Sequence, residues 1–129
     1  MIFLWQRVEE CEVRKDNDEF VSKIEKGIVI YVGIEKKDEE SVEILVEKGK
    51  KFIKNNFKAE NLMLLSQFTL MGEFRGKKPS FHKAGDNKKA EEVFYKLKEV
   101  LNAKSGIFRT LLKIKVKGDN LKPTVTILT

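Results

Sequence analysis

The chain has 129 residues, 41% of them hydrophobic, and a formal net charge of +6 at pH 7. This length suits one domain over residues 1–129, and the apolar content excludes a disordered chain. One cysteine, Cys11, and one histidine, His82, are too few for an internal disulfide or a zinc site. The sequence has neither a signal-peptide pattern nor an apolar run near the roughly 20 residues of a membrane span. We therefore expect a cytoplasmic protein with no metal and no other cofactor.

The charge balance indicates a class of partner. Charged residues make up 36% of the chain, with 26 lysines and arginines against 20 aspartates and glutamates. A basic surface favours polyanions such as nucleic acid or an anionic membrane. The alternative is a lysine-rich surface that contacts only solvent.

The first third of the chain is rich in predicted strands. Residues 2–8 are predicted to form one strand, and residues 11–15 and 20–24 a hairpin around the turn at 16–19. Residues 27–34 are a continuous run of apolar, mostly β-branched side chains. Such a run predicts a strand that is buried on both faces.

Helical spacing of apolar residues begins after this strand. It predicts a helix over 38–54 with Asp38 as its N-cap. Residues 61–70 read as a second buried strand, and residues 71–87 as a loop with glycines and a proline. A second amphipathic helix is predicted from Asn87 to the Lys-Ser-Gly sequence that ends it.

The last quarter of the chain returns to strand patterns. Residues 107–118 alternate toward their end and predict a strand with one wet, basic face. A turn at 119–123 leads to a β-branched strand at 123–129. The sum is an α+β domain with a curved, largely antiparallel sheet or β-barrel and two helices packed on it. Neither helix has the aromatic and basic face of a membrane-surface module.

Several common active-site patterns are missing from the sequence. There is no GxxxxGK[ST] phosphate loop and no GxGxxG fingerprint. His82 lies in a basic loop, where we expect a solvated surface residue. A carboxylate-pair hydrolase has no sequence support. An enzyme of this sequence would depend on backbone groups, hydroxyls and amides, or on groups of its substrate.

Four segments resemble the D-aminoacyl-tRNA deacylase family and occur in that family's order: WQRV at 5–8, GIVIYVGIEKKD at 27–38, LLSQFTL at 64–70 and RGKKPSF at 75–81. The resemblance implies a homodimer with its active site at the subunit interface. It also implies hydrolysis of the ester between tRNA and a D-amino acid, or glycine mischarged on tRNA(Ala). Such an enzyme serves chirality proofreading in translation.

On this resemblance the catalytic residues are Ser66, Gln67, Phe68 and Thr69. Backbone N–H groups around Phe68 and Thr69 would stabilise the oxyanion of ester hydrolysis. Ser66 and Gln67 would orient the ester or the terminal adenosine. Thr69 is a candidate nucleophile without a base, so attack by water assisted by the RNA's own hydroxyl is preferred. The alternative for Ser66 and Thr69 is a strand hydroxyl bonded to backbone.

The loop after this strand is basic, and its cations are predicted to contact phosphates of the tRNA acceptor end: Arg75, Lys77, Lys78 and Lys83. Phosphate contacts position an RNA without reading its sequence, which suits an enzyme that accepts many tRNAs. The alternative is a solvated loop. Phe74 or Phe81 could stack on a base, although a core position is expected for Phe81.

The C-terminal motif departs from the family pattern. Family members carry Asn-x-Gly-Pro before Val or Phe and Thr, with a cis Gly-Pro bond that enters the partner's pocket and rejects L-amino acids. Here Lys122 replaces that glycine before Pro123, and one extra residue precedes the Val-Thr pair. Lys122, Pro123 and Arg7 are predicted to bind the substrate and screen its chirality.

A hairpin that the family has after its first helix is also missing, which indicates a shortened, divergent member. The alternative function is that of a non-catalytic or altered-specificity tRNA-binding paralogue.

Overall fold

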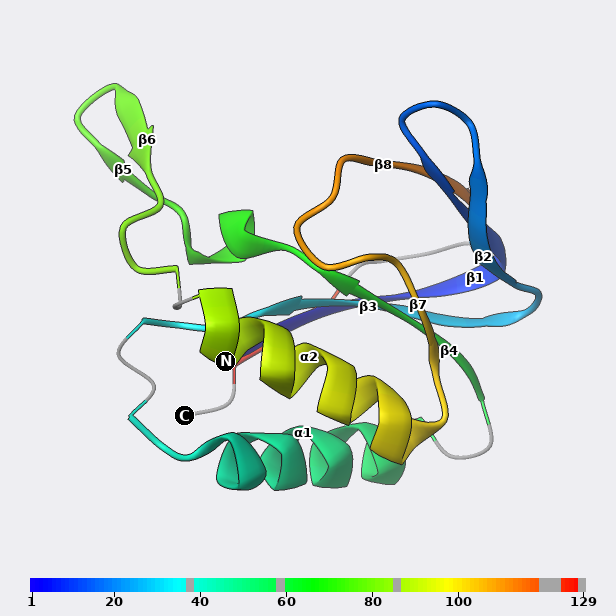
Figure 1. The fold of residues 1–129 in the computed structure, drawn as a ribbon, viewed down its shortest axis with the longest axis horizontal. Helices are drawn as coiled ribbons and strands as arrows, with labels where there is room; N and C mark the ends of the chain where they lie inside the picture. The colour runs from blue at the N-terminus through cyan, green and yellow to red at the C-terminus, as the bar shows by residue number, and fades with distance from the viewer. Residues whose placement is uncertain (37–38, 58–59, 85–86, 119–123, 128–129) are drawn as a thin grey trace.

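The computed structural model describes residues 1–36, 39–57, 60–84, 87–118 and 124–127. One curved, mostly antiparallel sheet carries both helices on one of its faces (Figure 1). This architecture confirms the predicted α+β fold class. None of the described helices is long and apolar enough to span a membrane.

Strands precede, separate and follow the two helices along the chain. Their bounds are β1 (Ile2–Lys15), β2 (Phe20–Ile24), β3 (Gly27–Gly33), α1 (Val42–Asn56), β4 (Asn61–Ser66), the 3-10 turn η1 (Phe68–Met71), β5 (Glu73–Arg75), β6 (Lys78–Ser80), α2 (Asn87–Leu101), β7 (Lys104–Ser105), β8 (Leu112–Gly118) and β9 (Thr124–Ile127).

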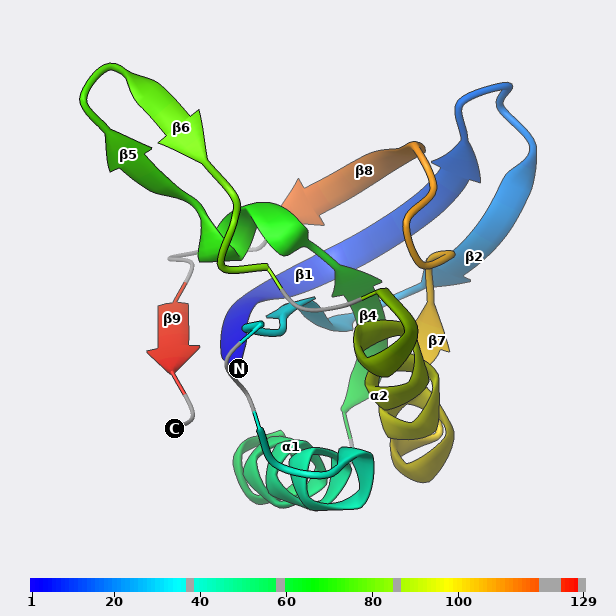
Figure 2. The same ribbon diagram turned by 60° about the vertical axis from the view of Figure 1, so that its left-hand side comes forward.

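The large sheet has the strand order β2-β1-β3-β4-β7, and β8 and β9 also pair with β1. All four partners of β1 run antiparallel to it, whereas β3–β4 and β4–β7 are parallel pairs. Parallel neighbours need a crossover connection. The helices α1 and α2 supply these two crossovers, which explains why both lie on the same face (Figure 2).

The strand β1 is continuous, so the prediction of separate strands at 2–8 and 11–15 was wrong. A register shift between Val8 and Glu10 interrupts its pairing with β8. Such a bulge changes which face the following side chains occupy. Val8 and Cys11 therefore both enter the same core, although an odd number of positions separates them.

The strand β3 is buried on both faces, as its apolar run predicts. Ile28 and Ile30 face the helices, while Val29 packs into a second core on the opposite side. The first core lies between sheet and helices and has Phe3, Leu64, Ile53, Phe94 and Leu97 among its members. The second core is enclosed by the curled hairpin β1–β2 and by β8. Its members are Val8, Cys11, Val13, Ile24, Val29, Met63 and Leu65.

The first helix begins later than predicted. It starts at Val42, and Ser41 is its N-cap, with its Oγ accepting a hydrogen bond from Ile44 N–H at 3.3 Å. Serine is as good a cap as aspartate. The predicted cap, Asp38, lies outside the described residues. The two helices approach closely at Gly49, where an added Cβ would lie 3.1 Å from a methyl group of Leu97.

The predicted strand at 61–70 ends early. It stops at Ser66, and the next residues turn into η1. The predicted loop at 71–87 contains the hairpin β5–β6, which projects from the body of the molecule (Figures 1 and 2). Its turn uses Gly76 at φ +67°, a conformation that glycine adopts without strain.

The predicted strand at 107–118 is shorter than expected. Only Leu112–Gly118 forms a strand, and a non-helical segment precedes it. Its lysines are exposed, which confirms the basic outer face. The final strand, predicted at 123–129, is Thr124–Ile127 and pairs with the start of β1. The predicted turn at 119–123 lies outside the described residues.

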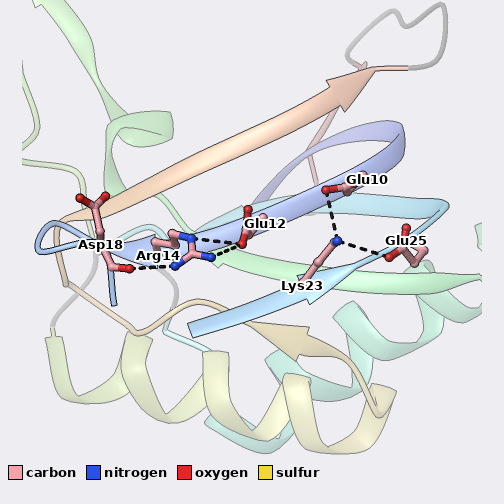
Figure 3. Close-up of polar contacts among 6 residues, drawn as sticks. All are labelled: Glu10, Glu12, Arg14, Asp18, Lys23 and Glu25. Carbon is pink, nitrogen blue, oxygen red and sulfur yellow. Dashed lines mark hydrogen bonds and ion pairs between the residues drawn. The ribbon is translucent and has the colours of Figure 1, made fainter. Parts of the chain in front are cut away.

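The predicted hairpin around residues 16–19 is confirmed, and charged side chains link its two strands (Figure 3). Arg14 donates to Glu12 Oε1 from Nη2 at 2.7 Å and to the Asp18 carbonyl from Nη1 at 2.9 Å. Lys23 on β2 pairs with Glu10 on β1 at 3.3 Å. Of these contacts, Lys23–Glu10 joins β1 to β2, and ion pairs this accessible to solvent contribute little stability each.

Candidate functional site

A pocket of about 560 Å³ lies at the carboxyl ends of β3 and β4. Its floor comes from these two strands, one wall from the start of α2, and another from the segment before β8. The described residues that line it are Tyr31, Val32, Gly33, Ile34, Leu65, Ser66, Gln67, Phe68, Ala84, Ala90, Phe94, Ile107, Phe108, Arg109, Thr110, Leu111, Leu112 and Ile114.

The pocket is where parallel pairing would place it. Val32 on β3 lies opposite Ser66 on β4, so both strands end at the same edge. Ligands of open α/β sheets bind at such carboxyl ends. Gly33 lets η1 fold back over this edge, because a Cβ there would lie 2.8 Å from Met71 Cε and 2.9 Å from Leu70 Cβ.

Three of the four predicted catalytic residues line the pocket: Ser66, Gln67 and Phe68. Thr69 is exposed and is not among the lining residues. The N–H of Gln67 bonds to the Val32 carbonyl at 2.9 Å, which continues the sheet pairing by one residue. The sheet therefore fixes the position of the backbone that enters the pocket.

The two amides expected to be free differ in the structure. Thr69 N–H donates to Gln67 Oε1 at 3.4 Å, so this donor already has a long hydrogen bond. None of the hydrogen bonds among the described residues uses Phe68 N–H. Phe68 opens the 3-10 turn, and the first N–H groups of a helical turn have no partner within it. Of the two donors, Phe68 N–H therefore has no partner among the described residues, and Phe68 lines the pocket.

Sequence reasoning missed the wall formed by the segment before β8. Phe108 N–H donates to Tyr95 OH at 3.0 Å, and the Phe108 ring packs against Phe94 at 5.8 Å. Arg109 has a φ of +55°. The polar pair Arg109–Thr110 interrupts the apolar alternation, and that interruption is the signal that separates this segment from a strand.

The chemistry of the pocket wall is limited. Its described lining contains no aspartate, glutamate, histidine or lysine. Burial raises the pKa of Tyr31, and the nearby Cys11 raises it further. The Tyr31 phenol therefore stays protonated at neutral pH and cannot act as a base there.

Arg7 does not reach this pocket. It lies opposite Ile28, near the start of β3, whereas the pocket is at the other end of that strand. Its guanidinium forms an ion pair with Glu60 at 2.7 Å. The other two predicted screening residues, Lys122 and Pro123, lie outside the described residues.

Two of the predicted tRNA-binding cations have partners within the protein. Glu73 contacts Arg75 at 3.4 Å and Lys83 at 2.8 Å. These hydrogen bonds and charges, led by Lys83, lower the pKa of Glu73. His82 Nε2 accepts from Arg75 at 2.8 Å, so its proton lies on Nδ1 and is donated to Ser80 Oγ at 2.8 Å.

The hairpin tip carries the other two cations, Lys77 and Lys78. Both are exposed, and no ion pair to either occurs among the described residues. Phe74 beside them is 77% exposed. The expected core position of Phe81 was wrong: it is 38% exposed and packs edge-on against Phe68 at 5.3 Å. Phe81 thus links the hairpin to the pocket rim.

Comparisons with known proteins fit this architecture. The sequence profile of the D-Tyr-tRNA(Tyr) deacylase family matches residues 4–126. The D-aminoacyl-tRNA deacylase of Kosmotoga olearia is 34% identical over 140 aligned residues, which cover 95% of this chain and 92% of the relative. That of Dictyoglomus turgidum is also 34% identical, over 88% of this chain and 84% of the relative.

Two solved structures share the fold. One, described as a c-Myc DNA unwinding element binding protein, has a TM-score of 0.76 and 23% identity, covering 100% of this chain and 99% of its own. The other, described as a probable eukaryotic D-amino acid tRNA deacylase, has a TM-score of 0.73 and 9% identity, covering 97% and 98%. The match of the family profile to nearly the whole sequence establishes that the chain belongs to the D-Tyr-tRNA(Tyr) deacylase family.

Proposed function

We propose that this protein hydrolyses the ester bond of D-aminoacyl-tRNA and releases the free D-amino acid and tRNA. Family membership and the free Phe68 N–H beside the pocket support this function. Glycine mischarged on tRNA(Ala) is a second substrate, because it has no side chain for a chiral screen to reject. Both activities would serve proofreading in the cytoplasm.

Phe68 N–H supplies the main stabilisation of the transition state in this proposal. Ester hydrolysis passes through an oxyanion, and a preorganised N–H donor stabilises it more than the ground-state carbonyl. The donor lies next to Ser66 and Gln67, whose side chains orient the ester. Rigid sheet pairing on the N-terminal side of Phe68 keeps the donor in place.

The attacking water takes its base from the substrate. The described pocket lining offers no carboxylate and no imidazole. The free hydroxyl next to the esterified one on the terminal ribose is within reach of any water that attacks the ester. We therefore assign the orientation of the water to this RNA hydroxyl.

The chiral screen comes from a second subunit in this proposal. Lys122 and Pro123 of one subunit enter the pocket of its partner and restrict the space at the Cα of the substrate. Lys122 stands where the family has glycine. The screen is therefore the part of the proposed site that is most altered in this chain.

The activity is tested by incubating the purified protein with D-tyrosyl-tRNA, L-tyrosyl-tRNA and glycyl-tRNA(Ala) and following ester loss. D-tyrosyl-tRNA and glycyl-tRNA(Ala) should lose their esters faster than in buffer, and L-tyrosyl-tRNA should not. Release at the protein-free rate from all three would refute the proposal.

The role of Phe68 N–H is tested with a matched pair of variants. Phe68→Pro removes the donor, and proline fits the first position of a helical turn. Gln67 before it has the extended backbone that a residue preceding proline requires, with φ −147° and ψ 97°. We expect kcat to fall by about 10²- to 10³-fold. Phe68→Ala also loses the ring but keeps the donor, so it should retain most of kcat.

Equal activity of the two Phe68 variants would contradict the assignment of the oxyanion donor. The melting temperatures of both should be compared first, so that unfolding is not mistaken for lost chemistry.

A second candidate function is salt-sensitive tRNA binding without turnover. It is favoured by Lys122, because a glycine is normally used where a backbone must approach a ligand closely. Tight binding of tRNA by a preparation that hydrolyses none of the three substrates would establish this alternative.

A further inference from the structure

Among the described residues that line the pocket, one side chain is charged. Arg109 is the only ionised residue among the described residues that line it; the rest are apolar, aromatic or neutral polar. Arginine stays protonated at any physiological pH. Its side chain is exposed at the pocket wall, so the charge acts at the pocket mouth and is partly screened by solvent and salt. Any ligand of this pocket is therefore selected by a fixed positive charge.

Arg109 also differs from the other arginines. Three of the four arginines form ion pairs with a glutamate: Arg7 with Glu60, Arg14 with Glu12 and Arg75 with Glu73. No ion pair or side-chain hydrogen bond of Arg109 occurs within the part of the chain that the structure describes. Its guanidinium has five donors that suit the oxygens of a phosphate or carboxylate.

The backbone under Arg109 is held in an uncommon conformation. Its φ of +55° lies in the left-handed region, which costs free energy for any residue with a Cβ. The turn is fixed from both sides of Arg109: Phe108 N–H donates to Tyr95 OH at 3.0 Å, and Thr110 Oγ1 donates to the Phe108 carbonyl at 3.4 Å. The exposed Arg109 side chain has no hydrogen bond or ion pair among the described residues that would account for this conformation, and strained residues cluster at ligand-binding sites.

The proposed substrate carries charges of both signs. An aminoacyl ester has an α-ammonium group at one end, and the RNA chain has a phosphate on the 5′ side of the terminal adenosine. The guanidinium repels the first and attracts the second. A pocket of about 560 Å³ is in the size range of sites for small ligands.

We propose that Arg109 binds the phosphate on the 5′ side of the terminal adenosine and so directs the ester toward Ser66 and Phe68. This inference rests on the proposed function and adds a positioning residue to it. It also predicts that the enzyme prefers a nucleotide ester to a nucleoside ester, although the bond that breaks is the same in both.

The test compares two small substrates, D-tyrosyl esters of adenosine and of adenosine 5′-monophosphate. The wild type should have a kcat/KM about 10- to 100-fold higher for the monophosphate ester, the usual value of a charge-assisted contact. Arg109→Gln should bring this ratio close to one, mainly through the KM of the monophosphate ester. Arg109→Lys keeps the charge but not the planar fork, so it should give an intermediate ratio.

Two further variants serve as controls. Lys51→Gln removes one positive charge from an exposed position on α1, remote from the pocket lining, and should leave the ratio unchanged. Arg109→Gly also removes the guanidinium, and glycine accepts the left-handed backbone, so this variant should fold at least as well as the wild type. It should show the same loss as Arg109→Gln. An equal fall of kcat/KM for both esters in Arg109→Gln and Arg109→Gly would overturn the proposal.

Failure of the proposed function is distinguishable from failure of this inference. A wild type that hydrolyses neither ester nor D-tyrosyl-tRNA refutes the deacylase activity. Calorimetric titration with adenosine 5′-monophosphate and with adenosine then tests Arg109 alone. Tighter binding of the monophosphate that disappears in Arg109→Gly supports the phosphate site, and equal binding of both compounds overturns it.

Discussion

Cys11 shows how strongly a single position can depend on its surroundings. Its side chain is completely buried in the second core, among Val8, Val13 and Met63. Burial raises the pKa of the thiol from 9.0 to about 11, because the thiolate would lose its hydration. The same burial explains why a lone cysteine persists here as a small apolar residue.

This burial predicts an inert thiol in the native protein. At pH 8 a pKa of about 11 leaves a thiolate fraction about 100-fold below that of a cysteine with a pKa of 9.0. Alkylation by iodoacetamide should therefore be at least about 100-fold slower in the folded protein than in urea. Because the pKa is raised, the slow rate should persist up to pH 9. Equal rates in both states would contradict the position of Cys11.

Some pocket residues can be predicted from a local sequence motif, and others cannot. Ser66 and Gln67 were found because their motif resembles a family pattern. Tyr95 and Arg109 were missed, since neither belongs to that motif and their roles depend on contacts across the fold. Arg7 lies at the opposite end of β3 from the pocket, a separation that follows from strand pairing and not from local sequence.

At the scale of elements, continuous patterns were predicted well and interruptions poorly. The two-faced burial of β3 and the helical stripes follow from side-chain periodicity alone. The bulge after Val8 was missed, because it depends on the register with β8. The hairpin β5–β6 was missed as well. Its turn consists of Gly76 and Lys77, and a two-residue turn that begins with glycine is a recognised hairpin pattern.

The hairpin β5–β6 predicts how tRNA binding responds to salt. Lys77 and Lys78 at its tip are exposed and have no ion pair among the described residues, so they can neutralise two phosphates. The double variant Lys77→Gln, Lys78→Gln should weaken tRNA binding. The slope of log K against log salt concentration should fall in magnitude by about 1 to 2. Filter binding between about 50 and about 200 mM salt measures this slope.

A matched double variant on the helix face provides the control for that experiment. Lys51→Gln with Lys54→Gln removes the same charge from exposed positions of α1. This pair should leave the salt slope unchanged, because α1 lies away from the hairpin (Figure 1). Equal slopes for both double variants would mean that net charge, and not the hairpin, attracts the RNA.

At the scale of the whole molecule, the pocket rim exposes large apolar side chains. Phe68 is 51% exposed, Leu111 80% and Ile114 38%, and all three line the pocket. Exposed apolar groups gathered around a pocket are typical of a surface that another molecule covers. A second copy of this chain is the partner that family resemblance implies, and it would also bring Pro123 to the site.

This arrangement predicts that two defective chains can complement one another. Phe68→Pro removes the proposed oxyanion donor, so its homodimer should hydrolyse little of either ester. Pro123→Ala alters the proposed screening segment, so its homodimer should hydrolyse L-tyrosyl-tRNA as well as D-tyrosyl-tRNA. In a twofold dimer each site would take its donor from one subunit and its screening segment from the other. In a co-expressed, randomly paired mixture the one active site of each heterodimer would then have an intact screen. Relative to Pro123→Ala alone, hydrolysis of D-tyrosyl-tRNA should fall to roughly a half and hydrolysis of L-tyrosyl-tRNA to roughly a quarter. An equal fall of both activities, or a chain that sediments as a monomer at enzymatic concentrations, would place the complete site within one subunit.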